Sequence, residues 1–125
     1  MKIAILLFDN YTALDVVGPY EVLSNIPGAK IYFVAEKPGL YKNSKGIQIS
    51  ADYSLTDIED PEILVIPGGF GIDSILNNQE ILKWINTVHK QSQWTTSVCS
   101  GALLLAEAGI LNGRKVQHIG TVLSS

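Results

Sequence analysis

The chain has 125 residues, of which 46% are hydrophobic and 17% charged, and its 9 basic and 12 acidic side chains give a net charge of −3. This length predicts one domain over residues 1–125, and the composition excludes an intrinsically disordered protein. Neither a basic patch nor an apolar stretch of membrane-spanning length occurs, so we expect no nucleic-acid partner and no membrane insertion. One cysteine allows no internal disulfide, which fits a cytoplasmic protein. No residue cluster has metal-ligand spacing, and we expect no cofactor.

Apolar runs along the chain predict a series of strands. Continuous runs, typical of strands buried on both faces, occupy 3–8 and 63–66. A less clear pattern at 30–35, with apolar residues from Ile31 to Val34, predicts a second buried strand, and a fourth strand is expected at 94–98. The segment 38–52 has the composition of surface structure, with a half-exposed strand at its alternating residues 46–50. After the turn at Asn112-Gly113, a further strand is expected up to Ile119.

Helical segments are expected after three of these strands, those at 3–8, 63–66 and 94–98. Thr12 and Asp15 have the spacing of a capping box, and Gly18-Pro19 is expected to interrupt that helix, with Pro19 beginning a new one. A second helix should begin at Asn77 or Asn78 and bury one apolar face, which consists of Ile81, Leu82, Ile85 and Val88. A third, buried helix is expected over 101–108. Strands that alternate with helices predict an α/β fold: a flavodoxin-like, doubly wound, mainly parallel sheet in the order 2-1-3-4 with helices on both faces.

Cys99 stands between a predicted strand and a predicted buried helix. This is the setting of a nucleophile elbow, where a tight turn exposes the side chain, and Gly101 two residues later fits that pattern although Ser97 replaces its first glycine. The thiolate would be stabilised there by the helix N-terminus. A lone cysteine in an apolar stretch is also a common core residue, and position alone leaves both interpretations open.

Two other strand ends carry candidate groups. Pro67-Gly68-Gly69 directly follows a buried strand, where glycines allow close approach of the backbone and can present N–H groups to an oxyanion, or form a plain turn. Asp15 is either a capping residue or an acid/base group next to the thiol. Neither His89, expected to be half-exposed, nor His118, in the last strand, forms a recognisable triad with Cys99.

Order and spacing of these motifs resemble the ThiJ/PfpI superfamily, which is related to the class I glutamine amidotransferases. The matching runs are Leu14-Asp15-Val16-Val17-Gly18-Pro19-Tyr20-Glu21-Val22, Val65-Ile66-Pro67-Gly68-Gly69, Val98-Cys99-Ser100-Gly101-Ala102 and residues 104–114. The first run looks like the isocyanide hydratase branch. Ser100 stands where peptidase-like members carry His, and Asp15 stands where members acting on glyoxals usually carry Glu.

The resemblance implies a site. Cys99 would be the nucleophile, Asp15 its acid/base partner, and Gly69 and Ser100 the donors of an oxyanion hole, while Gly68, Phe70 and His118 are expected to contact a small-molecule substrate. Family members tend to be homodimers, so we expect self-association. They are also longer, so we expect the chain to cover about the first two-thirds of the fold and to be incomplete at its C-terminal end. The segment at His118 is one residue shorter than the family pattern.

These residues support three hypotheses. The first is a Cys-dependent hydratase that adds water to a small electrophilic carbon, converting an isocyanide to a formamide. The second is a non-catalytic sensor of small molecules or oxidants, in which Cys99 is oxidised rather than turning over. The third is an inactive, truncated family member.

Overall fold

The computed structural model describes residues 1–91, 94–98 and 116–119. Within these residues a parallel sheet runs in the order β5-β2-β1-β6-β7-β8. Its strands are β1 (Lys2–Leu6), β2 (Lys30–Ala35), β5 (Tyr53–Ser54), β6 (Ile63–Ile66), β7 (Trp94–Val98) and β8 (Val116–Ile119). The strands predicted at 3–8, 30–35, 63–66 and 94–98 are β1, β2, β6 and β7, and their predicted order 2-1-3-4 is confirmed. β2 is less buried than predicted: only Val34 and Ala35 are buried, because the strand next to it, β5, has just two residues.

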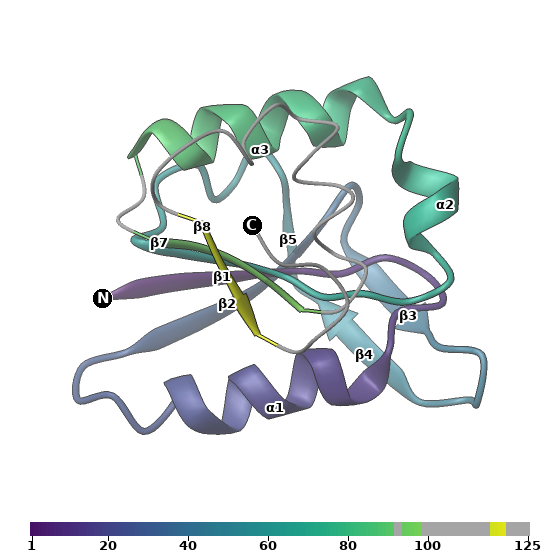
Figure 1. Cartoon of the computed structure of the whole chain (residues 1–125), viewed down its shortest axis with the longest axis horizontal. Helices are drawn as coiled ribbons and strands as arrows, with labels where there is room; N and C mark the ends of the chain where they lie inside the picture. The colour runs from purple at the N-terminus through teal and green to yellow at the C-terminus, as the bar shows by residue number, and fades with distance from the viewer. Residues whose placement is uncertain (92–93, 99–115, 120–125) are drawn as a thin grey trace.

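Helices cover both faces of the sheet. Figure 1 shows α1 (Ala13–Leu23) on one face and α3 (Gln79–Gln91) on the other, with the short α2 (Ile72–Ile75) leading into α3. The arrangement is a flavodoxin-like, doubly wound sheet, as predicted. Its core is made by β1 and β6, whose residues from Ile3 to Leu6 and from Ile63 to Ile66 are buried because helices cover them on both sides. In the described parts of the chain, no helix is both long and apolar enough to cross a lipid bilayer.

The first helix differs from the prediction. It is continuous, with the buried Pro19 inside it, and the side chain of its N-cap residue Thr12 makes no capping hydrogen bond. The capping-box assignment is therefore wrong, because the Asp15 carboxylate accepts a hydrogen bond from the loop after β6 instead of completing a cap. The predicted break at Gly18-Pro19 is also wrong. Pro19 removes one backbone donor, but packing of this face against the sheet keeps the helix in one piece.

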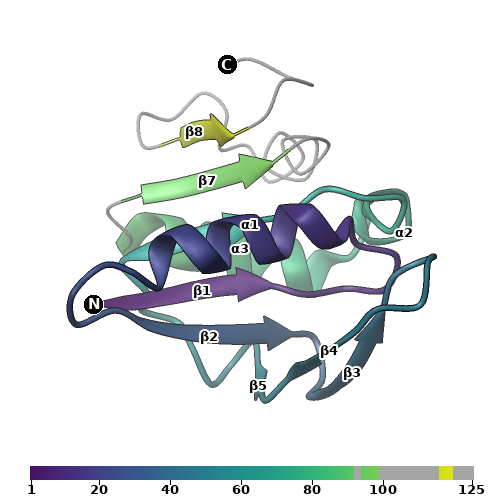
Figure 2. The ribbon, with the colours of Figure 1, turned by 90° about the horizontal axis from the view of Figure 1, so that it is seen from below.

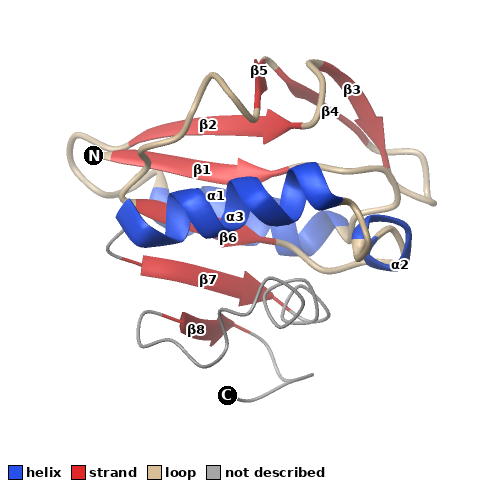
Figure 3. Ribbon diagram, turned by 90° about the horizontal axis from the view of Figure 1, so that it is seen from above, coloured by secondary structure: helices blue, strands red, loops and turns tan. Residues whose placement is uncertain are grey.

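The surface segment after β2 contains more structure than predicted. An antiparallel hairpin joins β3 (Gly39–Lys42) to β4 (Gln48–Ala51), which corresponds to the half-exposed strand expected at 46–50. Figures 2 and 3 show this hairpin beside the β2 end of the sheet, away from β7 and β8. The strands β3 and β5 and the helix α2 were not predicted, because each is short and only partly buried.

The second predicted helix is confirmed as α3. Asn78 precedes it and its side-chain Oδ1 accepts a hydrogen bond from the Ile81 N–H at 3.1 Å, which satisfies one of the free donors of the first turn. The four residues of the predicted apolar face are all buried, as is Trp84, and they attach the helix to the core. The predicted buried helix at 101–108 lies outside the described residues.

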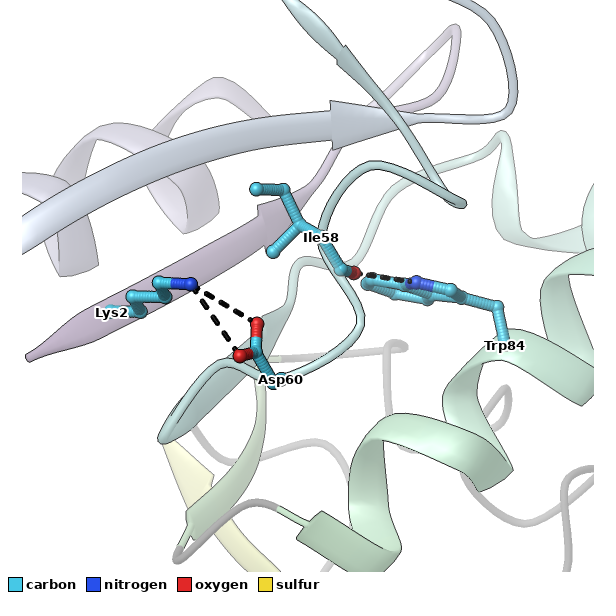
Figure 4. A network of polar contacts seen from close by, with 4 residues as sticks. All are labelled: Lys2, Ile58, Asp60 and Trp84. Carbon is cyan, nitrogen blue, oxygen red and sulfur yellow. Dashed lines mark hydrogen bonds and ion pairs between the residues drawn. The ribbon is translucent and has the colours of Figure 1, made fainter.

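Two polar contacts near the amino ends of the strands differ in burial and should differ in energy (Figure 4). The Trp84 indole is buried and its Nε1–H donates to the Ile58 carbonyl at 2.9 Å. The Lys2–Asp60 ion pair, at 3.3 Å, joins side chains that are 46% and 63% exposed.

We expect Trp84→Phe to lower the free energy of unfolding by about 1–3 kcal/mol, because it leaves a buried acceptor without its donor. Asp60→Asn should change it by less than about 0.5 kcal/mol. Urea denaturation of both variants measures the contrast, and equal losses would contradict it.

Candidate functional site

The carboxyl ends of β1, β6 and β7 meet at one edge of the sheet, where parallel α/β proteins bind their ligands (Figure 3). The loop after β1 lies between two other segments at this edge. On one side it contacts the loop after β6, and on the other the β3–β4 hairpin. The last residue of β7, Val98, directly precedes Cys99 in the sequence. Cys99 and Ser100 lie outside the described residues.

Asp15 is the buried carboxylate of this edge. The residue is only 5% exposed, and its Oδ2 accepts a hydrogen bond at 3.3 Å from the backbone N–H of Gly68, 53 residues along the chain. The first turn of α1 positions it, with the Asp15 N–H donating to the Thr12 carbonyl at 3.0 Å. Two residues singled out from different parts of the sequence, Asp15 and Gly68, are thereby brought together.

Gly69 is the point of closest approach between the loops after β1 and β6. It pairs with Tyr11 in an isolated antiparallel bridge, and its neighbour Gly68 accepts a hydrogen bond from the Thr12 N–H at 2.9 Å. Its φ of 137° is a conformation that favours glycine, and a Cβ atom here would stand 2.5 Å from the Asn10 carbonyl oxygen. Gly69 is thus required for the close approach of two backbones, and its role as an oxyanion donor stays a prediction.

Gly71 is a second close approach, which sequence reasoning missed. Its N–H donates to the Asn10 carbonyl at 3.2 Å, and a Cβ atom would stand 1.9 Å from the Asp9 carbonyl oxygen. Gly71 is the third glycine within the four residues 68–71, and this glycine-rich run is the sequence signal that could have indicated the close approach.

Tyr11 and Asn10 attach the hairpin to the other side of the same loop, and sequence reasoning missed both. The buried Tyr11 hydroxyl lies 2.9 Å from the Ile47 carbonyl oxygen and 3.2 Å from that of Tyr41, either of which can accept its proton. The Asn10 N–H donates to the Lys42 carbonyl at 2.9 Å, and its positive φ of 64° is one that asparagine tolerates. The turn of the hairpin is therefore held in place against the candidate site.

Burial raises the pKa of Tyr11 above its usual value of 10.0, and the nearby negative charge of Asp9 adds to the increase. As the pH rises, this tyrosine ionises in the unfolded chain before it does so in the folded one, so ionisation favours unfolding. The stabilisation is present below about pH 10 and is lost as the pH rises through the pKa of the folded state.

We expect Tyr11→Phe to lower the free energy of unfolding by about 1–2 kcal/mol at pH 8, because the variant loses the hydrogen bond of the hydroxyl. Urea denaturation should show this difference shrinking at pH 10.5, and a constant difference would contradict the assignment.

A cleft of about 330 Å³ opens between the start of α1, the hairpin turn and the loop after β6. We call it the α1–hairpin cleft; its lining residues are Asn10, Tyr11, Thr12, Ala13, Leu14, Asn43, Ser44, Lys45, Ile47 and Phe70. Phe70, expected to contact substrate, lies at this cleft with 83% of its surface exposed. Leu14 and Phe70 are sequence neighbours of Asp15 and Gly69, so the cleft adjoins the candidate catalytic edge.

The DJ-1/PfpI family model matches residues 1–122. The chain belongs to the DJ-1/PfpI family. It is 30% identical over 115 residues to an isonitrile hydratase of Pseudomonas putida, covering 92% of this chain and 50% of that protein. It is 24% identical to the deglycase PfpI of Pyrococcus furiosus, covering 96% and 74% of the two chains. A solved ThiJ/PfpI family protein from Pseudomonas syringae superposes with a TM-score of 0.91 at 26% identity, covering 97% of this chain and 62% of that one.

These comparisons confirm the family resemblance and the fold expected from the sequence. The DJ-1/PfpI chain spans about half the length of the isonitrile hydratase it matches. Of the predicted site residues, the structure brings Asp15, Gly68, Gly69 and Phe70 to one edge. His118 lies in β8 with its backbone paired to Ser97 of β7, and His89 is half-buried on α3, as expected. The described residues contain no group of three or more acidic, histidine or cysteine side chains that could hold a metal ion.

Proposed function

We propose that this DJ-1/PfpI chain is a cysteine-dependent hydratase that converts an isocyanide to the N-substituted formamide, with Cys99 as nucleophile and Asp15 as acid/base group. The observation that carries the proposal is the buried Asp15 carboxylate, held by the Gly68 N–H at the edge where β7 leads into Cys99. A carboxyl group in this setting can give and accept protons away from bulk water.

The reaction needs one nucleophile and one proton carrier. In the first step the Cys99 thiolate forms a C–S bond to the terminal carbon of R–NC, and that carbon receives a proton from the Asp15 carboxyl, which gives a thioformimidate, Cys–S–CH=N–R. Water then adds across the C=N bond, its hydroxyl to carbon and its proton to nitrogen. When the C–S bond breaks, the hydroxyl proton returns to Asp15. The products are R–NH–CHO and the original thiolate, so no oxidant or reductant is required.

Two substitutions relative to other branches favour hydration over deglycation or proteolysis. Position 15 carries Asp, whereas family members that act on glyoxals usually carry Glu, and position 100 carries Ser, whereas peptidase-like members carry His. The match to the isonitrile hydratase, at 30% identity, is also higher than that to the deglycase, at 24%.

The test is a turnover assay on the full chain with an isocyanide and, separately, with methylglyoxal. Proton NMR detects the formyl hydrogen of the product, which we expect with the isocyanide only. Cys99→Ser should abolish it, because a hydroxyl is far less ionised than a thiol at neutral pH. Absence of formamide, or unchanged turnover in Cys99→Ser, would overturn the proposal. Peroxide-dependent oxidation of Cys99 without turnover would support the sensor hypothesis instead.

A further inference from the structure

The α1–hairpin cleft is surrounded by large apolar side chains that the fold leaves exposed. Leu14, Ile47 and Phe70 are 75%, 48% and 83% exposed, and they come from three separate segments: the first turn of α1, the hairpin turn and the loop after β6. Single exposed apolar residues are ordinary on protein surfaces, but three around one concave site are typical of ligand binding.

Two polar side chains of the cleft, Asn43 and Tyr11, hold the hairpin in place. The Asn43 Oδ1 accepts hydrogen bonds from the N–H groups of Lys45 and Ile47, at 3.0 and 2.9 Å. The Tyr11 hydroxyl is directed to backbone carbonyls. A ligand here is therefore not expected to bind through these two side chains, while the exposed Leu14, Ile47 and Phe70 offer it apolar contact.

The volume of the cleft and the charge of its lining limit the kind of ligand that it can bind. A volume of about 330 Å³ is at the small end of ligand pockets, and it is about twice the ~150 Å³ cavity that accommodates benzene. Lys45 is the only charged residue among those that line the cleft in the described part of the chain, so a cationic group is disfavoured. An aromatic ring is the apolar group that can both stack on Phe70 and interact favourably with an ammonium group.

We propose that the α1–hairpin cleft binds the organic substituent of the substrate and prefers a neutral aryl group of about benzyl size. The inference rests on the proposed function for the identity of the reacting isocyanide group. The aryl preference follows from the volume and lining of the cleft, which includes Leu14 and Phe70, the sequence neighbours of Asp15 and Gly69.

Binding is tested first without turnover, using the formamide products as probes. N-benzylformamide, N-(cyclohexylmethyl)formamide and N-methylformamide are titrated onto the full chain and followed by amide NMR shifts. We expect the benzyl compound to shift the signals of Leu14, Lys45, Ile47 and Phe70. It should bind about 3–10-fold more tightly than its saturated counterpart, the range for an aromatic contact, and at least tenfold more tightly than the methyl compound.

Variants separate aromatic contact from general apolar contact. Phe70→Leu should reduce the benzyl preference over cyclohexylmethyl to about twofold or less, and Lys45→Gln should reduce it in part. Leu40→Ala is the matched control, because Leu40 is an apolar β3 residue that is 67% exposed and does not line the cleft. Equal affinity for all three formamides, or shifts that map elsewhere, would overturn the proposal. A third result would also overturn it: sedimentation shows a dimer that Phe70→Leu dissociates, while the preference for the benzyl compound is retained. Phe70 would then be covered by a second copy of the chain and not by the aryl group.

Kinetics distinguish the failure of this inference from the failure of the proposed function. If benzyl isocyanide is hydrated no better than methyl isocyanide in kcat/KM, the cleft proposal fails and the hydratase stands. If the benzyl formamide binds at the cleft with the expected preference but no isocyanide is hydrated, the subsite stands and the hydratase proposal fails.

Discussion

Replacing Gly71 by alanine should lower the free energy of unfolding by about 3–5 kcal/mol. The added Cβ would stand 1.9 Å from the Asp9 carbonyl oxygen and 2.8 Å from Cδ1 of the buried Phe8, distances that no small adjustment relieves. The backbones must separate, which strains the hydrogen bond from the Gly71 N–H to the Asn10 carbonyl. A lost buried hydrogen bond costs about 1–3 kcal/mol, and overpacking about as much again.

Two other glycines provide controls in the same urea titration. Gly18 lies inside α1, where an added Cβ would meet only the Leu14 Cδ1 atom at 4.0 Å, so Gly18→Ala should stabilise by about 0.5–1 kcal/mol. Gly28 has a φ of 79° and no atom within 4 Å of an added Cβ, so Gly28→Ala isolates backbone strain, about 1–2 kcal/mol. A Gly71→Ala variant within 1 kcal/mol of the parent chain would show that the two loops are not in close contact.

The parts of the fold that could be predicted from the sequence are those with a clear hydrophobic pattern, such as the fully buried strands β1 and β6 and the amphipathic helix α3. Residues such as Ile5 and Val65 lie in strands covered on both faces, so the whole run is apolar and its order in the sheet follows from right-handed crossovers. The hairpin strand β3 has three exposed residues and one partly buried residue, and so short a segment has no distinctive hydrophobic pattern. A break at Pro19 was predicted because the free-energy cost of a proline inside a helix can be inferred from the sequence. The packing that keeps α1 continuous cannot be inferred from it.

The candidate site was predictable where it depends on strand ends. Asp15, Gly68 and Gly69 follow buried strands, and the structure brings them together through the bond from the Gly68 N–H to Asp15. The role of Tyr11 could not be predicted, because its partners are backbone carbonyls 30 and 36 residues away, which any sequence supplies. The roles of Cys99, Ser100 and His118, and the homodimer, stay predictions.

Replacing Asp15 by asparagine should reduce isocyanide hydration by a factor of about 10²–10⁴, the usual contribution of a positioned acid/base group. The amide oxygen of asparagine can still accept the hydrogen bond from the Gly68 N–H at the position of Oδ2, so the loop after β6 should keep its place. The loss should therefore appear in kcat, with KM changed little, because asparagine binds at the same position but cannot pass a proton on. Asp73→Asn is the matched control, since Asp73 is an exposed carboxylate in the first turn of α2.

Alkylation of Cys99 separates this proton-transfer role from a merely structural one. Iodoacetamide reacts with the thiolate and needs no proton donor, so Asp15→Asn should keep a thiol that is alkylated at pH 7 while it loses turnover. Cys99→Ala should lose both alkylation and turnover, because Cys99 is the only cysteine of the chain. If Asp15→Asn abolished alkylation and turnover together while remaining folded, the carboxylate would act by shaping the cysteine environment rather than by carrying the proton. If Asp15→Asn left turnover intact, the role of Asp15 would be structural only, namely to hold α1 and the loop after β6 together. Another group would then have to protonate the isocyanide carbon.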